Sequence, residues 1–396
     1  MNQIVSKKIF IAAITSVALM SFFSIVYTWQ AADAEIEQIT SQILGPLASA
    51  EERAGGGLVV SSVRQKPPKQ TVKAIYLTAY SAGSPKKIDE IISLINRTEL
   101  NAVVMDIKDY SGLVLFNTQV PLAKKLKLVD NRYHDLAATI KKLHAHNIYV
   151  IARQTVFQDP ILAEKFPELA LKKVGGGPTS SAGRLWRDHK GLAWVDPTKK
   201  EVWEYNVAIA KDAIGYGFDE INFDYIRFPS DGNMASVIYS NLGQKKYLAM
   251  AKFYNYLTSK LRALPAWLSF DMFGFVMEKT GEDDMNIGQR LDDALPVADY
   301  ISPMMYPSHY PPGHLGLKNP AAHPDLVITH GMTLGAPRFK NSRALLRPWL
   351  QAFDLRAVYN GDMIRAEINA VEKFPNAGWM LWNASNRYTS AGLKAE

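Results

Sequence analysis

Three aspartates stand where short apolar runs end: Asp106, Asp224 and Asp271 close the runs AVVMD, EINFD and LSFD. A charged side chain at the end of a buried strand lowers stability unless it is paired or lies in a hydrated site. Cleavage of a glycosidic bond uses two carboxyl groups, one protonated to donate to the leaving oxygen and one ionised to act as nucleophile or to activate water. The residue types therefore predict carboxylate chemistry of this kind.

Different roles are expected for two of these carboxyl groups. Asp224 is the candidate for the ionised group, because Arg227 follows three residues later and would lower its pKa. Asp271 is the candidate acid, because the apolar residues of the run MFGF that begins after it would raise its pKa. The structural alternative is an ion pair between Arg227 and Asp224 that closes the rim of the fold, with Asp271 capping a loop.

The first aspartate belongs to a cluster of charges, Asp106, Lys108 and Asp109, which a turn sequence YSG follows. These side chains would bind sugar hydroxyls, with Lys108 neutralising one of its aspartate neighbours. The alternative is a solvated cluster at a strand end.

Aromatic and polar side chains near other strand ends complete the candidate site, since sugars present flat apolar C–H faces and many hydroxyls. Aromatic residues in such folds are more often core, and amides often build turns. Beyond the charged cluster and Arg227, the substrate-binding candidates are Tyr306, His309, Trp349, Gln351, Trp382 and Asn383. The long connection 157–196 is interpreted as a mobile cover, with Trp186 or Trp194 as a sugar platform, or else as a surface insertion without a role.

Strand-like and helix-like runs alternate from Val72 onward and would position these side chains. This pattern predicts a closed parallel (β/α)8 TIM-like barrel rather than an open sheet. The segment 325–339 is interpreted as the sixth helix, although VITHGMTL also fits a strand. The expected strands are 74–80, 102–109, 148–154, 220–228, 266–274, 299–306, 346–353 and 377–384.

Alternation along these strands predicts which side chains face the interior. On the fourth strand Ile221, Phe223 and Tyr225 would pack outward under helices, with Asn222 and Asp224 facing inward. The same alternation turns Asp106 and Asp271 inward. Active sites of such barrels lie at the C-terminal ends of the strands, so the three carboxylates should converge at one opening.

The N-terminal 34 residues are predicted to be a signal peptide or membrane anchor. Lys7 and Lys8 precede an uncharged apolar run, 9–29, and Ala32 and Ala34 form an A-x-A cleavage pattern. Residues 35–71 are polar and small, with Gly55–Gly57 and Pro67–Pro68, and are interpreted as a flexible linker to a barrel domain at 72–396. The barrel is therefore expected outside the cytoplasm, as a secreted, periplasmic or membrane-anchored domain.

Composition excludes several classes of function. The 396 residues contain no cysteine, so a disulfide scaffold, a thiolate metal site and a cysteine nucleophile are ruled out. The net charge of +7 comes without a basic block, so nucleic acid is not an expected partner, and membrane contact is expected only through the N-terminal segment. Gly175–Gly177 lack the following Lys-Ser/Thr of a phosphate loop, and no cofactor is expected. Oligomeric state stays open.

Several longer segments together resemble one known family. The segment GFDEINFDYIRFPSDG (217–232) is the most specific, and the others are AVVMDIKDYSG (102–112), LSFDMFG (268–274), ISPMMYPSHYP (301–311) and RPWLQAFDL (347–355). They resemble the glycoside hydrolase-like family DUF4015 over nearly all of 74–389. The resemblance implies a TIM barrel, an extracytoplasmic bacterial protein and action on polysaccharide, with Asp224 and Asp271 at the acidic positions of the motifs.

Two other functions remain open. A non-catalytic polysaccharide-binding or scaffold barrel is favoured by the lack of a glutamate at any strand end where an acid would lie. A metal-dependent hydrolase or deacetylase has less support, because the eight histidines show no H-E-x-x-H pattern and no pairing with aspartate at ligand spacing, so no metal site is predicted.

Overall fold

The computed structural model describes residues 64–175, 185–240 and 243–396. The predicted signal or anchor segment, 1–34, and the linker up to residue 63 lie outside the described residues. No helix of the described ranges is long and apolar enough to span a bilayer.

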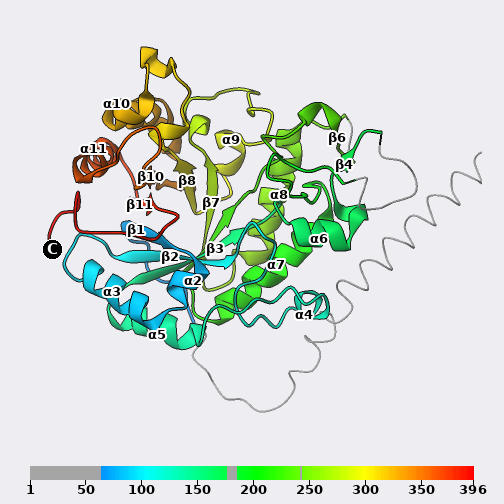
Figure 1. The fold of residues 1–396 in the computed structure, drawn as a ribbon, viewed down its shortest axis with the longest axis horizontal. Coiled ribbons are helices and arrows are strands. Elements are labelled where there is room, and N and C mark those ends of the chain that lie inside the picture. The colour runs from blue at the N-terminus through cyan, green and yellow to red at the C-terminus, as the bar shows by residue number, and fades with distance from the viewer. Residues whose placement is uncertain (1–63, 176–184, 241–242) are drawn as a thin grey trace, which may run out of the picture. The chain divides into compact units, whose positions relative to one another are not determined.

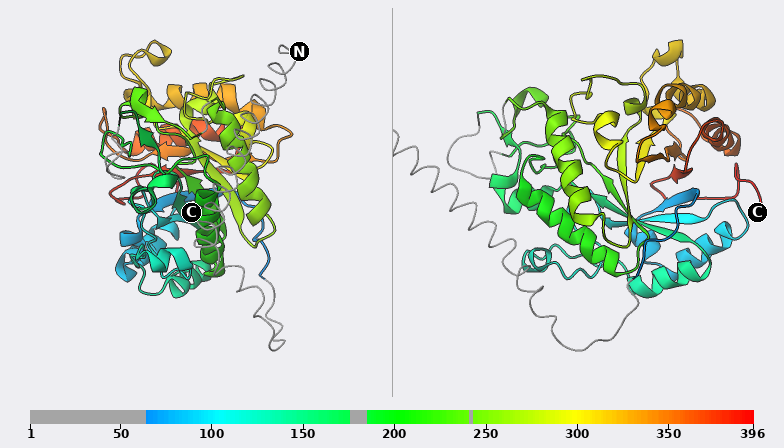
Figure 2. Two further views of the ribbon diagram at one scale, coloured as in Figure 1. Left: turned by 90° about the vertical axis from the view of Figure 1, so that its right-hand side faces the viewer. Right: turned by 180° about the vertical axis from the view of Figure 1, so that it is seen from behind.

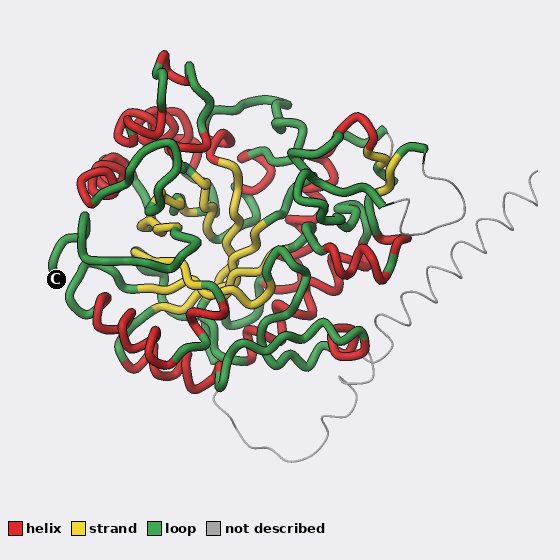
Figure 3. The backbone as a smooth tube through the Cα atoms, viewed as in Figure 1, coloured by secondary structure: helices red, strands yellow, loops and turns green. Residues whose placement is uncertain are grey.

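The described chain forms a closed barrel of eight parallel staves, as predicted. A stave here is one strand position in the ring. β1 pairs with β2 on one side and with β11 on the other, and a pairing between β8 and β10 completes the ring. The strands lie together at the centre of the molecule with helices around them (Figure 3). The barrel strands are β1 (Val72–Leu77), β2 (Ala102–Lys108), β3 (Tyr149–Thr155), β5 (Glu220–Asp224), β7 (Trp267–Phe273), β8 (Tyr300–Met304), β9 (Leu345–Leu346), β10 (Trp349–Gln351) and β11 (Gly378–Trp382).

The seventh stave is built from two short strands, β9 and β10. Arg347 and Pro348 separate them, and proline has no N–H to donate to a neighbouring strand. The chain nevertheless stays in the sheet, because the Arg347 N–H donates to Ile301 O and the Met380 N–H donates to Pro348 O. Outside the barrel, β4 (Lys172–Lys173) and β6 (Val237–Ile238) form a small antiparallel pair.

Helices connect the staves and cover the outside of the barrel (Figure 1). α7 and α8 pack side by side (Figure 2), and α10 confirms the helix predicted at 325–339. The helices are α2 (Ala79–Ala82), α3 (Pro85–Ile95), α4 (Pro121–Lys125), α5 (Leu136–Ala145), α6 (Pro160–Lys165), α7 (Lys200–Gly215), α8 (Lys246–Leu261), α9 (Leu291–Ala294), α10 (Pro324–Gly335) and α11 (Gly361–Glu372).

Local sequence accounts for where α3 begins. At the start of α3 the Ser84 hydroxyl accepts the N–H of Lys87, and Pro85 occupies the first helical position, where its missing N–H would be unpaired in any case. Ile88, Ile92 and Ile95 recur at three- and four-residue spacing, and all are buried. The helix therefore buries one apolar stripe against the barrel.

Side chains fill the interior of the barrel, so the half nearer the N-terminal ends of the strands is a packed core. Tyr149, Val104 and Met380 belong to one buried cluster inside the ring. A buried ion pair between Arg347 and Glu220 joins the seventh stave to the fourth. Below it, residues 64–71 contact the N-terminal ends of the strands: Arg64 pairs with Asp219 at 3.1 Å, and the Trp267 indole N–H donates to Pro67 O.

Candidate active site

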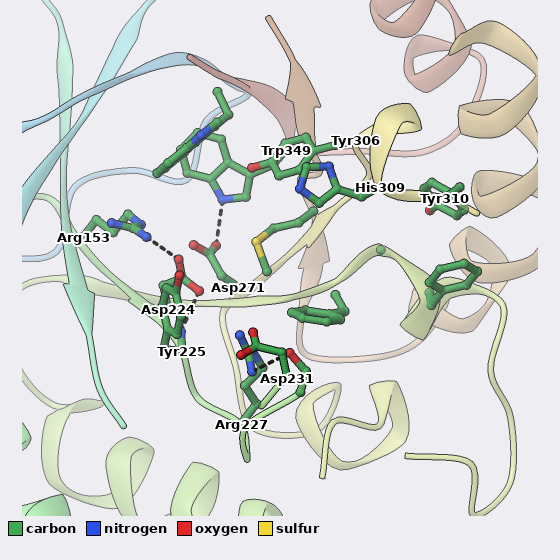
Figure 4. A pocket seen from close by; sticks show the side chains of 16 residues that line it. Arg153, Asp224, Tyr225, Arg227, Asp231, Asp271, Tyr306, His309, Tyr310 and Trp349 are labelled. Atoms are coloured by element: carbon green, nitrogen blue, oxygen red, sulfur yellow. Dashed lines mark hydrogen bonds and ion pairs between the residues drawn. The ribbon is translucent and has the colours of Figure 1, made fainter. Parts of the chain in front are cut away.

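A pocket of about 480 Å³ opens at the C-terminal ends of the strands. Asp224, Phe273, Met304 and Trp382 line it, and each is the last residue of its strand. Figure 4 shows side chains from several staves pointing into this one space. The full lining is Arg153, Asp224, Tyr225, Arg227, Ser230, Asp231, Asp271, Phe273, Gly274, Phe275, Met304, Tyr306, His309, Tyr310, Trp349 and Trp382.

Asp224, at the end of β5, is held by a cation and a backbone donor. Its Oδ2 atom pairs with the Arg153 guanidinium at 2.5 Å, and its Oδ1 atom accepts the N–H of Tyr225 at 2.6 Å. The side chain is buried, yet it borders the pocket. The ion pair and the hydrogen bond together hold both carboxylate oxygens of Asp224 in place.

Asp271, on β7, has different surroundings. Its Oδ1 atom accepts two hydrogen bonds at 2.8 Å, one from the Asn222 amide and one from the Trp349 indole N–H. Its Oδ2 atom has no partner among the described residues. Burial raises the pKa of Asp271 well above its usual range, and the negative charge of Asp224 raises it further. The two carboxyl groups therefore border one pocket in opposite electrostatic surroundings.

Arg153, from β3, bridges two of the three predicted carboxylates. It pairs with Asp106 at 2.7 Å through Nη1 and with Asp224 through Nη2. Asp106 faces inward as predicted, but it lies behind Arg153 and outside the pocket lining, and it also accepts the Tyr76 hydroxyl at 2.5 Å. The carboxylates on the second and fourth staves thus share one cation.

The predicted pairing of Arg227 with Asp224 is wrong. Tyr225 has a φ of 53°, a left-handed conformation that is rare for an aromatic residue, and the backbone turns there. The Arg227 guanidinium instead donates to Phe228 O at 3.0 Å and to the Ser230 hydroxyl at 3.3 Å. Because the turn ends the strand alternation, the Tyr225 side chain, which was expected to face outward, lines the pocket.

Four predicted aromatic residues line the pocket: Tyr306, His309, Trp349 and Trp382. Trp349 is fully buried and donates to Asp271, so it orients the carboxyl group. Trp382 is partly exposed and stacks on Tyr76, with ring centroids 3.8 Å apart. Burial lowers the pKa of His309, which favours a neutral imidazole.

The structure gives the other predicted binding residues partners outside this pocket. Lys108 is fully buried and pairs with Asp159 at 2.9 Å. It was expected to neutralise Asp106 or Asp109, but a register shift in β2 between Asp106 and Lys108 turns it away from both. Asp109 accepts the N–H and hydroxyl of Ser111 in a turn.

Two amide candidates on the last staves also support loops. The Gln351 side chain accepts the Ser308 N–H and donates to Phe353 O. Asn383 donates to Ala352 O and lines an adjoining cavity of about 960 Å³, which shares His309 and Trp382 with the first.

The two tryptophans of the connection 157–196 are not platforms. Trp186 and Trp194 are 1% and 2% exposed, and their indole N–H groups donate to Asn233 O and to the Asp188 carboxylate. One or the other was expected as a sugar platform, but the described parts of this connection bury both side chains. Residues 176–184 lie outside the described residues.

Arg153 and Asn222 are the residues that sequence reasoning missed as functional. A charged residue directly after the apolar run YVIA of β3 was the available signal for Arg153, because a buried cation requires anionic partners. In the described ranges, no group of three or more His, Asp or Glu side chains is arranged to hold a metal ion.

Comparisons with known proteins bear on the fold. No curated protein matches the chain. A hypothetical protein from Ruminiclostridium thermocellum ATCC 27405 is 38% identical over 50% of this chain and 96% of that chain, with a TM-score of 0.45. The glycoside hydrolase domain of PgaB (BpsB) from Bordetella bronchiseptica is 12% identical over 80% of this chain and 94% of that chain, with a TM-score of 0.55, and shares the fold.

The family comparison covers most of the described barrel. Residues 74–388 match DUF4015, which is described as a putative glycosyl hydrolase domain. This match supports a glycoside hydrolase role and a carbohydrate substrate. The chain therefore belongs to the family DUF4015.

Proposed function

We propose that the barrel hydrolyses glycosidic bonds of a polysaccharide, with Asp271 as the general acid and Asp224 as the ionised carboxylate. The observation that carries this proposal is the meeting of two carboxyl groups in one pocket, one paired with Arg153 and the other buried with a raised pKa. Glycoside cleavage needs this difference between its two carboxyl groups.

The acid proton would reside on Oδ2 of Asp271. Its Oδ1 atom already accepts two N–H groups, so only Oδ2 is free to carry and donate a proton. Donation to the leaving oxygen generates a carboxylate, which the same two N–H groups stabilise. Asn222 and Trp349 therefore support both protonation states in turn.

Asp224 would attack the anomeric carbon or take a proton from the attacking water. The Tyr225 N–H and Arg153 fix the orientation of its two oxygens. Arg153 also lies 4.9 Å from the Trp382 ring centroid, which restricts the guanidinium further.

A polymeric substrate is supported by the space around the carboxyl groups. The pocket has the size of a small-ligand site, and the adjoining cavity continues past His309 and Trp382. A saccharide longer than one residue would extend from one cavity into the other across the partly exposed Trp382 ring.

The test is to screen the full chain against bacterial envelope and extracellular polysaccharides while measuring released reducing ends. Asp224→Asn and Asp271→Asn should each lower turnover by about 10²- to 10⁴-fold, because each removes a group that transfers a proton or charge. Asp109→Asn, which changes an aspartate outside the pocket, is the matched control and should retain activity. Activity should also persist in the presence of a chelator.

The binding-only alternative makes a different prediction in the same experiment. A scaffold barrel would retain affinity for the polysaccharide and show no turnover for either aspartate variant to lose. Saccharide binding by calorimetry without any released reducing ends would therefore overturn the catalytic proposal.

We further propose that the barrel acts outside the cytoplasm, as a secreted, periplasmic or membrane-anchored domain. The support is the sequence alone: two lysines, an uncharged apolar run and an A-x-A pattern within residues 1–34. N-terminal sequencing of protein recovered from fractionated cells tests this proposal. Recovery of the barrel in the cytoplasmic fraction would contradict it.

A further inference from the structure

Arg227 differs from the other buried arginines of the barrel. Arg153 and Arg347 each pair with carboxylates, whereas no carboxylate of the described residues lies within 4.0 Å of the Arg227 guanidinium. Its side chain is nevertheless buried, with the residue only 8% exposed. A buried cation without a counter-ion lowers stability, and an anionic ligand would supply the missing counter-charge.

The Arg227 guanidinium is held in place, and some of its N–H donors have no partner among the described residues. Its Nη1 atom donates to Phe228 O and Ser230 Oγ, while Nε and Nη2 have no hydrogen-bond partner among the described residues. The rings of Trp194, Tyr225 and Phe273 surround it, with centroids 5.1, 5.1 and 4.7 Å from the guanidinium carbon. Burial lowers the pKa of Arg227 by removing the hydration of the charged guanidinium.

The free donors border the same pocket as the two catalytic candidates. In the view of Figure 4, Arg227 and Asp231 lie on one side of the pocket, Trp349 and Tyr306 lie on the other, and Asp224 and Asp271 lie between them. A saccharide whose scissile bond meets the two carboxyl groups would place a neighbouring substituent against Arg227.

Three carboxylates act on Arg227 from a distance. Asp224 is already paired with Arg153, and Asp188 accepts the Gln158 amide and the Trp194 indole N–H. Asp231 is exposed, and its Oδ1 atom accepts the His189 N–H at 3.1 Å. Only Asp231 would compete directly with an anion entering the pocket.

We infer that Arg227 binds an anionic group of the saccharide, so that the substrate is an acidic polysaccharide carrying a carboxylate or a sulfate or phosphate ester. The planar fork of Nε and Nη2 matches two oxygens of such a group. This inference rests on the proposed function for its polysaccharide, and it assigns to Arg227 a specificity role instead of the expected partnership with Asp224.

The test measures binding by the full chain of sugars that differ only at one substituent. Glucuronate is compared with glucose, galacturonate with galactose, and glucose 6-sulfate and 6-phosphate with glucose. At least one anionic sugar should bind about 10- to 100-fold more tightly than its neutral partner, as expected for charge-assisted hydrogen bonds. The four anionic sugars distinguish carboxylate from ester recognition.

Two variants should move this preference in opposite directions. Arg227→Gln should abolish it, so that each anionic sugar binds no more tightly than its neutral partner. Asp231→Asn keeps the acceptor for the His189 N–H and should strengthen anionic binding by about 2- to 5-fold through loss of a nearby negative charge. Arg97→Gln removes an exposed arginine beyond the end of α3 and is the matched charge control.

Equal binding of anionic and neutral sugars by the unchanged protein would overturn the inference, as would a preference that survives in Arg227→Gln. Because Asp231→Asn leaves Arg227 intact, the inference stays testable even if Arg227→Gln does not fold. The two proposals also fail separately. If Asp224→Asn loses polysaccharide turnover and no anionic sugar is preferred, the hydrolase proposal stands and the Arg227 proposal fails. If an anionic sugar is preferred and no turnover is measured, the Arg227 proposal stands and the hydrolase proposal fails.

Discussion

Asp224 and Asp271 have the same side chain, and their neighbours give them different chemistry. Arg153 compensates the charge of Asp224, whereas Asp271 receives only neutral donors, from Asn222 and Trp349. A neutral N–H stabilises a carboxylate less than a guanidinium does. The two carboxyl groups therefore differ in the charge of the donors that contact them.

Trp349→Phe tests the role of one of these donors. The indole N–H lowers the pKa of Asp271, so its removal should raise that pKa further. If Asp271 must be protonated to act, activity is lost as the pH rises through its pKa, and the alkaline limb of the pH profile of kcat/KM should move to higher pH. The measurement is that profile on the cleaved polysaccharide.

Trp379→Phe is the matched control, because Trp379 is buried near the start of β11, where its indole N–H donates to Glu372. Its alkaline limb should coincide with that of the unchanged protein. An alkaline limb that moved to lower pH in Trp349→Phe would contradict the assignment of Asp271 as the acid.

At the scale of elements, β2 illustrates how a register shift separates neighbouring charges. Asp106 faces the interior of the barrel, and after the shift Lys108 points into a fully buried contact with Asp159 and the Thr155 carbonyl. Asp159 also caps α6 by accepting the Leu162 N–H. This pair therefore ties the end of β2 to the loop and helix after β3.

Lys108→Met should destabilise the barrel by about 3–5 kcal/mol, because it leaves the buried Asp159 without a counter-charge. Neither residue lines the pocket, so turnover at a temperature well below unfolding should be unchanged. Urea unfolding and the reducing-end assay measure the two effects. Lys87→Met, which breaks an exposed pair with Glu90, should change stability by less than about 1 kcal/mol. Weaker polysaccharide binding at unchanged stability would instead return Lys108 to the substrate site.

At the scale of the whole molecule, closure of the barrel connects the strands that carry the site. The buried pair of Arg347 and Glu220 joins staves that are far apart in the chain, and Tyr149 adds a hydrogen bond to Glu220 at 3.1 Å. Because the carboxyl groups come from different staves, their relative position depends on closure of the ring.

A double-mutant cycle tests this connection. Arg347→Met and Glu220→Gln should each cost about 3–5 kcal/mol in the free energy of unfolding, because each leaves the other residue of the buried pair without its counter-charge. The double variant should cost less than the sum of the two, since no charge remains unpaired. Urea unfolding of the four proteins measures the coupling. Additive costs would show that the two side chains stabilise the barrel independently.

The eight staves could be predicted from sequence because alternation of strand and helix patterns is local and repeats along the chain. The same local alternation predicted the inward direction of Asp106, Asp224 and Asp271. It failed at Tyr225, where a left-handed residue ends the strand pattern, and at Lys108, which follows the register shift.

The chain by itself determined the order of strands and helices and the inward direction of the carboxyl groups, because both depend on short-range periodicity. Only the tertiary structure decided the partners: Arg153 rather than Arg227 for Asp224, and Asp159 for Lys108. It also decided that Trp186 and Trp194 are buried. Ion pairs and burial depend on which residues of distant strands become neighbours, and spacing along the chain carries no information about distances across the barrel.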